Sequence, residues 1–245
     1  MKERTVEGQA RECSIPLIGR RKEVEALASA LSGRQSCLML GPAGIGKTRL
    51  IQEAMALSRP PCVCIEQPMG MVLHQLLVEL AGSLGCSGRL ADFQCATSLA
   101  LKAMVWEALR ATPRCIVLED MADADPRMYR FLQRVYYIPG VCLIVTARSR
   151  SGLGHLRKLL WDPREEIALG PLNRAESLAL FEAASRECDL GGLDLDGFRR
   201  QALAAARGSP GQIQAMCRLA CHPQYRNGRH IKFLPLRMDA LPAFV

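Results

Sequence analysis

One glycine-rich segment that ends in lysine and threonine constrains this chain more than any other stretch. It reads Gly41-Pro42-Ala43-Gly44-Ile45-Gly46-Lys47-Thr48, after the apolar run Cys37-Leu38-Met39-Leu40 and before the helix-like stretch 49–57. This is G-x-x-x-x-G-K-[ST] between a strand and a helix. Glycines let backbone N–H groups converge on one point, and the positive end of the following helix adds to them. The sequence therefore predicts a loop that cradles an anion such as phosphate.

Two side chains of this segment indicate which anion is held. Lys47 would reach the β- and γ-phosphates of a nucleotide, and the Thr48 hydroxyl would bind Mg²⁺, which takes few protein ligands. The alternative interpretation is a glycine-rich turn before an ordinary helix. Because the lysine, the threonine and the flanking elements agree, we expect ATP and Mg²⁺ as cofactors. The residues predicted to contact the nucleotide in this segment are Gly41, Pro42, Ala43, Gly44, Ile45, Gly46, Lys47, Thr48 and Arg49.

Length, charge and hydropathy limit the class of protein. The 245 residues are enough for one medium α/β domain and a smaller appendage. The net charge of +8 favours anionic partners such as nucleic acid. No apolar run is long enough to span a bilayer, and no signal-peptide core follows the first residues. We therefore expect a cytoplasmic protein with no membrane partner.

The eleven cysteines fit a reducing compartment. Several stand inside apolar, strand-like runs, where buried reduced thiols are expected: Cys37, Cys62, Cys64, Cys115 and Cys142. A second possibility is a structural zinc site, because Cys217, Cys221 and His222 have helical spacing, although no second cysteine pair lies nearby.

The apolar pattern predicts an α/β fold. Continuous apolar runs predict strands at 37–40, 62–65, 114–118, 141–146 and 166–169. Helical periodicity predicts helices at 21–31, 49–57, 126–137 and 153–160, together with one carrying Val72, Leu76, Leu77 and Leu80 and another with Leu99, Ala103, Trp106 and Leu109 on its apolar face. Runs buried on both faces and separated by helices indicate a parallel sheet. We predict a three-layer α/β sandwich with a five-stranded parallel sheet.

The character of the sequence changes at Pro171, after which three helices are predicted and no strand. These helices span 174–185, 195–207 and 210–221 and would form a small α-helical lid. The predicted organisation is a flexible N-terminal arm (1–14), an α/β core (15–170), the lid (171–222) and a basic extended tail (223–245).

Two carboxylates end the third predicted strand. Glu119 and Asp120 stand where a phosphate-loop protein needs an acid near the metal. Successive side chains point in different directions, so one carboxylate can face Mg²⁺ and the other a water that attacks the γ-phosphate. The alternative is a solvated acidic turn, which Asp123 and Asp125 nearby would favour.

Arginines follow the fourth predicted strand. Arg148 would emerge at the same sheet edge as the phosphate loop, where a cation can contact the γ-phosphate. Arg150, Arg157 and Arg164 come next, and one of them could reach the nucleotide of a neighbouring subunit. Pro210 stands at the start of the last lid helix and has two interpretations. It is either a proline of the kind favoured in a first helical turn, or part of a helix end that approaches the nucleotide.

Together these motifs resemble the AAA+ and STAND superfamilies of P-loop ATPases, over about residues 17–219. The segment Ile18-Gly19-Arg20-Arg21-Lys22-Glu23 is similar to their opening Gly-Arg-x-x-Glu motif, which implies that Gly19 and Arg20 lie near the adenine. Segment 41–48 matches Walker A, 115–120 resembles Walker B, and Thr146-Ala147-Arg148 resembles the sensor-1 arginine motif. Leu169-Gly170-Pro171-Leu172 looks like the lid entry and Gly208-Ser209-Pro210 like the lid Gly-x-Pro motif.

The chain departs from these families at the acidic pair. The order is Glu-Asp where many AAA+ members have Asp-Glu, so Glu119 would take the Mg²⁺ position and Asp120, with a shorter side chain, the water-polarising position. The resemblance therefore implies either slow hydrolysis or a switch that mainly binds ATP. Lys47, Glu119, Asp120 and Arg148 are the predicted catalytic residues, with Thr48 and Glu119 as metal ligands.

Three functions are compatible with these residues. The first is an ATPase whose nucleotide state controls homo-oligomer assembly and docking to DNA or to a separate protein effector. The second is a signalling or scaffold module that holds ATP with little or no hydrolysis. The third, a small-molecule kinase, is disfavoured because the predicted lid is apolar and no acceptor pocket is evident.

Overall fold

The computed structural model describes residues 15–58, 62–66, 71–86 and 90–240. They form two compact units. One, the ATPase unit, spans Arg20–Gly170, and the other, the helical unit, combines residues 15–19 with 171–240. The predicted core began at Ile15, and this boundary was wrong by five residues, because Ile15 packs into the apolar core of the helical unit. The predicted arm at 1–14 lies outside the described residues.

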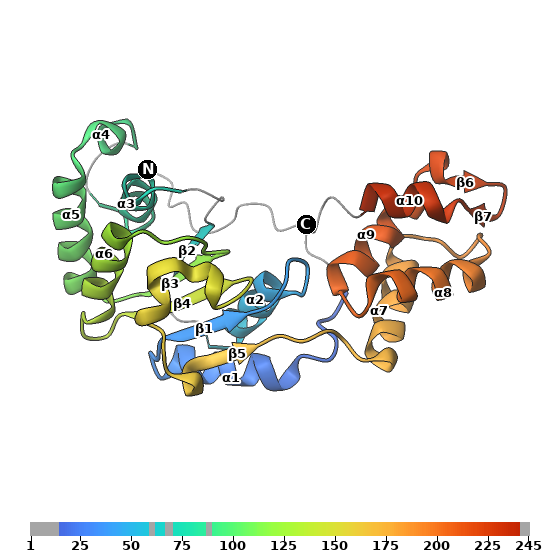
Figure 1. Ribbon diagram of the computed structural model, residues 1–245, viewed down its shortest axis with the longest axis horizontal. Coiled ribbons are helices and arrows are strands. Elements are labelled where there is room, and N and C mark those ends of the chain that lie inside the picture. The colour runs from blue at the N-terminus through green and yellow to red at the C-terminus, as the bar shows by residue number, and fades with distance from the viewer. Residues whose placement is uncertain (1–14, 59–61, 67–70, 87–89, 241–245) are drawn as a thin grey trace. The chain divides into compact units, whose positions relative to one another are not determined.

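The ATPase unit is built on the predicted five-stranded parallel sheet, which is confirmed (Figure 1). Its order is β2-β3-β4-β1-β5, so the strand that leads into the phosphate loop lies between β4 and β5. The strands are β1 (Cys37–Leu40), β2 (Cys62–Glu66), β3 (Cys115–Glu119), β4 (Cys142–Ala147) and β5 (Glu166–Ala168).

Helices cover both faces of this sheet. They are α1 (Arg21–Ser32), α2 (Lys47–Ser58), α3 (Leu73–Ser83), α4 (Leu90–Cys95), α5 (Ser98–Ala111) and α6 (Pro126–Tyr136). Alternate strand residues such as Ile116 and Leu118 share one core with α3, α5 and α6. Helices α1 and α2 pack on each other and bury Leu27 and Leu50 outside that core. The result is three layers, as predicted.

Two predictions within this unit were wrong in detail. The apolar face of α5 is formed by Leu101, Val105 and Leu109, whereas Leu99 is 77% exposed. The predicted set that contains Leu99 and the observed set that contains Leu101 both have helical spacing. Packing of α5 against α3 buries the set with Leu101. The helix predicted at 153–160 is the 3-10 segment η1 (Ser151–Lys158), which Gly154 interrupts with a φ of 57°.

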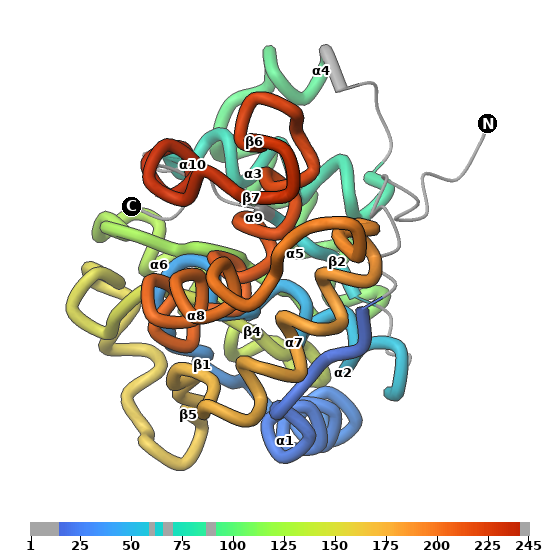
Figure 2. The backbone as a smooth tube through the Cα atoms, turned by 90° about the vertical axis from the view of Figure 1, so that its right-hand side faces the viewer, coloured from blue at the N-terminus to red at the C-terminus, as the bar shows by residue number. Residues whose placement is uncertain are grey.

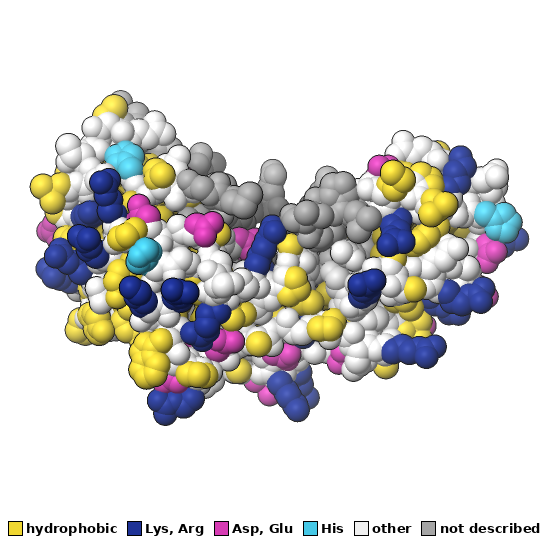
Figure 3. Space-filling view, in the orientation of Figure 1, with side chains coloured by type: hydrophobic (Ala, Val, Ile, Leu, Met, Phe, Trp, Pro, Cys, Tyr) yellow, Lys and Arg dark blue, Asp and Glu magenta, His cyan; other side chains and the backbone are white. Residues whose placement is uncertain are grey.

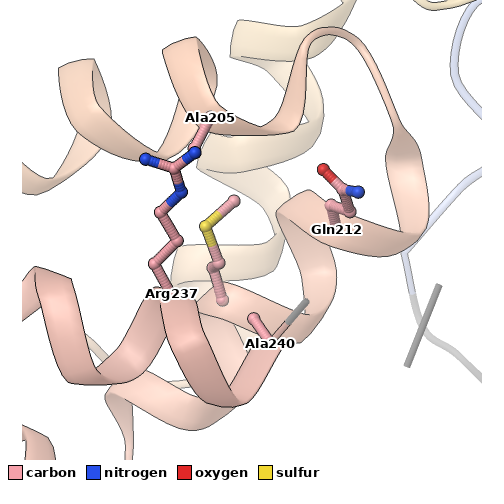
Figure 4. A pocket seen from close by; sticks show the side chains of 5 residues that line it. Ala205, Gln212, Arg237 and Ala240 are labelled. Carbon is pink, nitrogen blue, oxygen red and sulfur yellow. The ribbon is translucent and has the colours of Figure 1, made fainter. Parts of the chain in front are cut away.

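The helical unit contains α7 (Arg174–Glu187), α8 (Leu195–Ala206), α9 (Pro210–Ala220) and α10 (Phe233–Ala240) (Figure 2). Asn173 and Glu176 begin α7 with a capping box, in which each side chain accepts a backbone N–H of the other residue. A small hollow lies between α8, α9 and α10, lined by Ala205, Gln212, Met216, Arg237 and Ala240 (Figure 4).

The prediction of an extended tail after residue 222 was wrong. The chain forms a short 3-10 turn (Pro223–Tyr225), a hairpin of β6 (Arg226–Asn227) and β7 (His230–Ile231), and then α10. The two-residue hairpin turn is Gly228-Arg229, and Gly228 takes its first position with a φ of 59°. Pro235 lies in the first turn of α10, where proline is tolerated, and Leu236 is fully buried in the core of the helical unit.

Burial sets the state of the thiols. Cys37, Cys115, Cys142 and Cys217 are buried free thiols, and Cys62 and Cys64 are half-buried. Burial, with smaller contributions from Glu165 and Glu166, raises the pKa of Cys37 to about 12. Within the described residues no helix is long and apolar enough to cross a bilayer.

Candidate nucleotide site

The glycine-rich loop lies at the carboxyl end of the sheet. The Gly41 N–H donates to the Ala147 carbonyl of β4 at 3.1 Å, and the Leu169 N–H donates to the Leu40 carbonyl at 2.8 Å. These bonds continue the pairing of β1 with both neighbours and fix where the loop begins. A Cβ at Gly41 would lie 2.9 Å from the Ile45 side chain and 3.1 Å from the Leu169 carbonyl oxygen, so only glycine fits there.

The loop turns through two residues in the left-handed region. Gly44 has a φ of 72° and Gly46 a φ of 101°, which favour glycine. Helix α2 then begins at Lys47, and the Leu50 N–H donates to the Gly46 carbonyl at 3.0 Å. Ile45 is buried and ties the loop to the core. The sequence thus folds locally into a turn whose N–H groups precede a helix start.

Lys47 is buried and held at the loop. Its Nζ donates to the carbonyl oxygens of Gly41 at 2.9 Å and Pro42 at 3.3 Å. It also lies 3.3 Å from Oδ1 of Asp120, whose side chain is 62% exposed. A buried ammonium requires such partners, because removing it from water is costly. The structure therefore brings together one predicted phosphate-binding residue and one predicted catalytic acid.

Thr48 meets the other predicted acid. Its hydroxyl donates to the Glu119 carboxylate, and Glu119 is buried at the last position of β3. The two residues are 71 positions apart in the chain. A hydroxyl oxygen and a carboxylate oxygen in contact form the type of donor set that Mg²⁺ takes. These two residues therefore fit a magnesium ion.

Thr146 fixes the backbone of Asp120. Its fully buried Oγ1 accepts the Asp120 N–H at 2.8 Å, and its carbonyl accepts the Met121 N–H at 2.8 Å. Asp120 has a φ of 49°, a conformation that is costly for residues other than glycine and is maintained by surrounding contacts. Sequence reasoning quoted Thr146 only as part of a motif. The signal it missed was a small hydroxyl residue at the end of the strand beside the acidic pair.

The acidic loop after β3 is anchored. Asp123 donates its N–H to the Gly152 carbonyl at 2.7 Å, and His155 donates its N–H to the Ala124 carbonyl at 3.0 Å. Gly154 packs on this loop so closely that a Cβ there would lie 2.7 Å from the Ala124 oxygen. Asp125 caps α6 through its Oδ1, which accepts the Met128 N–H at 2.7 Å. The second half of the acidic stretch therefore has structural partners, whereas Glu119 and Asp120 face the loop.

The arginines after β4 differ in their contacts. Arg148 is exposed and, among the described residues, makes no hydrogen bond or ion pair. Arg150 binds the Glu166 carboxylate and donates to the Leu160 carbonyl at 2.9 Å. Arg164 pairs with Asp162 at 2.7 Å. Arg150 and Arg164 therefore have partners within their own chain.

The remaining predicted contact residues lie apart from the loop contacts described above. Arg49 pairs with Glu53 at 2.9 Å. Arg20 is buried at the start of the ATPase unit, where its guanidinium donates to the Gly170 carbonyl at the other end of that unit. Gly19 and Pro210 belong to the helical unit, where Pro210 begins α9. Their predicted approach to a nucleotide stays a prediction.

The described residues hold no cluster of three or more His, Cys, Asp or Glu side chains that fits a metal ion. Two cysteines of the suggested zinc site have other contacts. Cys221 Sγ donates to the Cys188 carbonyl at 3.3 Å, and Cys217 Sγ lies 4.0 Å from the Ser185 hydroxyl. Burial raises the pKa of Cys217 to about 12, so its thiol stays protonated near neutral pH.

One protein-family model matches part of the chain. The model of the AAA ATPase domain family matches residues 16–136. No curated protein matches the chain.

Three solved structures share its fold. A Walker-type ATPase of Pyrococcus abyssi has a TM-score of 0.61 and 18% identity, covering 92% of this chain and 72% of that one. A STAND protein of Pyrococcus horikoshii with a tetratricopeptide repeat sensor has a TM-score of 0.53 and 17% identity, covering 94% of this chain and 33% of that one. Thermotoga maritima RuvB has a TM-score of 0.58 and 13% identity, covering 92% and 70%.

The family model confirms the predicted resemblance to AAA+ ATPases, and the Walker-type ATPase and the STAND protein share the fold of this chain. The stretch 16–136, which holds the phosphate loop, Glu119, Asp120 and α6, therefore matches the AAA ATPase domain family.

Proposed function

We propose that this protein binds ATP with Mg²⁺, hydrolyses it slowly, and uses its nucleotide state to control assembly with further copies and docking to another macromolecule. The observation that carries the proposal is the contact of Lys47 and Thr48 with the two carboxylates that end β3. These are the four side chains that nucleotide chemistry needs at this place, and they come from segments about 70 residues apart.

Each residue has a role that its contacts support. Lys47 would exchange its loop carbonyls and Asp120 for the phosphate oxygens of ATP. Thr48 and Glu119 would hold Mg²⁺, which neutralises phosphate charge when bound. Asp120 would orient and deprotonate the attacking water, and Arg148, which lacks a partner among the described residues, would contact the γ-phosphate.

Lys47→Ala tests the nucleotide site. We expect the variant to lose ATP binding in isothermal titration calorimetry with magnesium, and any ATP-dependent change in mass measured by light scattering after gel filtration. Lys158→Ala, at an exposed lysine, is the matched control and should behave as the wild type. Thermal unfolding of both variants checks the fold. ATP binding or ATP-dependent assembly that is unchanged in a folded Lys47→Ala protein would contradict the proposal.

A second candidate is an ATP-holding scaffold without turnover. It is favoured by the ion pair between Asp120 and Lys47, which engages the predicted water-polarising acid with a cation. Phosphate release under single-turnover conditions separates the two functions. Release that disappears in Asp120→Asn while ATP binding persists favours the ATPase. Absence of release from the wild type, at saturating ATP and magnesium, favours the scaffold.

A further inference from the structure

Two rows of cations run along neighbouring helices of the ATPase unit, and none of these cations is a predicted residue of the nucleotide site. Lys102 and Arg110 are eight residues apart on α5, and Arg127, Arg130 and Arg134 follow the i, i+3, i+7 pattern on α6. We call these five residues the basic seam. Helical rise places the outer members of each row roughly 10 to 12 Å apart. Each row therefore presents cations along one side of its helix.

The two rows meet at the junction of α5 and α6, where Arg134 of one row packs on Trp106. Trp106 lies midway between Lys102 and Arg110, on the same row. The Arg134 guanidinium carbon is 5.2 Å from the centre of the Trp106 ring, and the Trp106 and Phe131 rings stack with centroids 6.0 Å apart. These contacts show which flank of each helix meets the other. Figure 3 shows lysine and arginine side chains gathered over α5 and α6.

The seam cations lack counter-ions. Arg110, Arg127, Arg130 and Arg134 are exposed and Lys102 is partly exposed. None of the five forms an ion pair within the parts of the chain that the structure describes. Glu107, the acidic residue of α5, lies three residues before Arg110, and among the described residues it forms no ion pair with any of the five cations. Unpaired cations in two rows produce a positive potential that a polyanion would complement.

We propose that the basic seam binds the phosphate backbone of duplex nucleic acid without reading its sequence. Arginine matches phosphate because its planar fork donates two hydrogen bonds to two oxygens. Two rows of cations on neighbouring helices suit a partner with two rows of regularly spaced phosphates. The Trp106 ring between the rows contacts Arg134 and Phe131, so it is not an open platform on which single-stranded bases could stack.

The seam is a different surface from the one that composition suggested. The sequence pointed to the last residues as the basic element, but part of that segment folds as α10 on the helical unit. The seam also contains no residue of the nucleotide site. Lys47→Ala should therefore retain duplex binding, which separates failure of this proposal from failure of the proposed ATPase function.

The test is fluorescence anisotropy of a labelled, mixed-sequence DNA duplex titrated with the full chain at increasing salt. The triple variant Arg110→Gln, Arg127→Gln, Arg130→Gln removes three seam cations and keeps Arg134, which packs on Trp106. If each removed cation met a phosphate, the slope of log affinity against log salt should become shallower by about 2.7. Between about 50 and 200 mM salt, the variant should then lose about 40-fold less affinity than the wild type loses.

A control of equal charge is Arg21→Gln, Lys22→Gln, Arg164→Gln. Arg21 and Arg164 are highly exposed but already paired with Glu25 and Asp162. This variant should keep the wild-type salt slope, and circular dichroism checks that both variants are folded. An unchanged slope in the seam variant, an equal loss in the control, or no duplex binding by the wild type at low salt would overturn the proposal. Tighter binding of the seam to polyglutamate than to a duplex of equal charge would also overturn the proposal, because the partner would then be an acidic polypeptide.

Discussion

Replacing Thr146 by valine should slow phosphate release while leaving ATP affinity nearly unchanged. Valine keeps the shape of threonine but removes the hydroxyl that accepts the Asp120 N–H at 2.8 Å. Thr146 is fully buried at the end of β4. Its hydroxyl supports Asp120 through the backbone, so it acts as a positioning residue for the acid that we assign to the attacking water.

The magnitude follows from the lost hydrogen bond. Leaving one buried partner unsatisfied costs about 1 to 3 kcal/mol. The φ of Asp120 is 49°, an unfavourable backbone conformation. Without the hydrogen bond from its N–H to Thr146, we expect this backbone to relax and to move the Asp120 carboxylate. If the whole cost appears as misplacement of the carboxylate in the reacting state, phosphate release falls about fivefold to 150-fold, since about 1.4 kcal/mol is a factor of ten.

The assay measures phosphate release and ATP affinity separately. We expect kcat to fall and the calorimetric Kd for ATP to change little, because Lys47 and Thr48 keep their contacts with the loop and with Glu119. Thr146→Ser retains the hydroxyl and should restore most of the rate. A purely structural role would instead lower stability in both variants and shift Kd and kcat together. A folded Thr146→Val protein with wild-type kcat would refute the reasoning.

Two further predictions concern stability and reactivity. Gly154 has a φ of 57° and a ψ of −127°, in the mirror-β region that glycine alone enters readily, and a Cβ there would lie 2.7 Å from the Ala124 oxygen. Gly154→Ala should therefore lower the free energy of unfolding in urea by more than the roughly 1 to 2 kcal/mol that a left-handed α residue costs. Gly85→Ala, at a φ of 69° with no atom of the described residues within 4 Å of its Cβ position, should cost only the backbone contribution, and equal losses in the two variants would contradict this account. Cys37 should resist alkylation by iodoacetamide at pH 8, because burial raises its pKa to about 12 and keeps the thiol protonated, while exposed Cys95 reacts. Because the pKa of Cys37 is raised on folding, the contribution of this thiol to stability is complete below its ordinary pKa of about 9 and is progressively lost towards pH 12. Peptide mapping that finds Cys37 alkylated as fast as Cys95 in folded protein would show this assignment to be wrong.

Features that depend on neighbouring residues could be predicted from the amino-acid sequence. The loop at 41–48 was readable because glycines, lysine and threonine at fixed spacing have one physical use between a strand and a helix. The parallel sheet was readable because its strands are buried on both faces and therefore continuously apolar, as in Cys142–Ala147. Helix starts such as Asn173 with Glu176 also follow from neighbours in the chain.

Tertiary structure decided what depends on distant residues. Two apolar rows of α5 have equal periodicity, and only packing on α3 selects Leu101 over Leu99. The support of Asp120 by Thr146 joins positions 26 apart, and the contact of Thr48 with Glu119 joins positions 71 apart. The tail folds because the core of the helical unit buries Leu236. Periodicity and spacing describe one element at a time, whereas these contacts exist only once separate elements pack together.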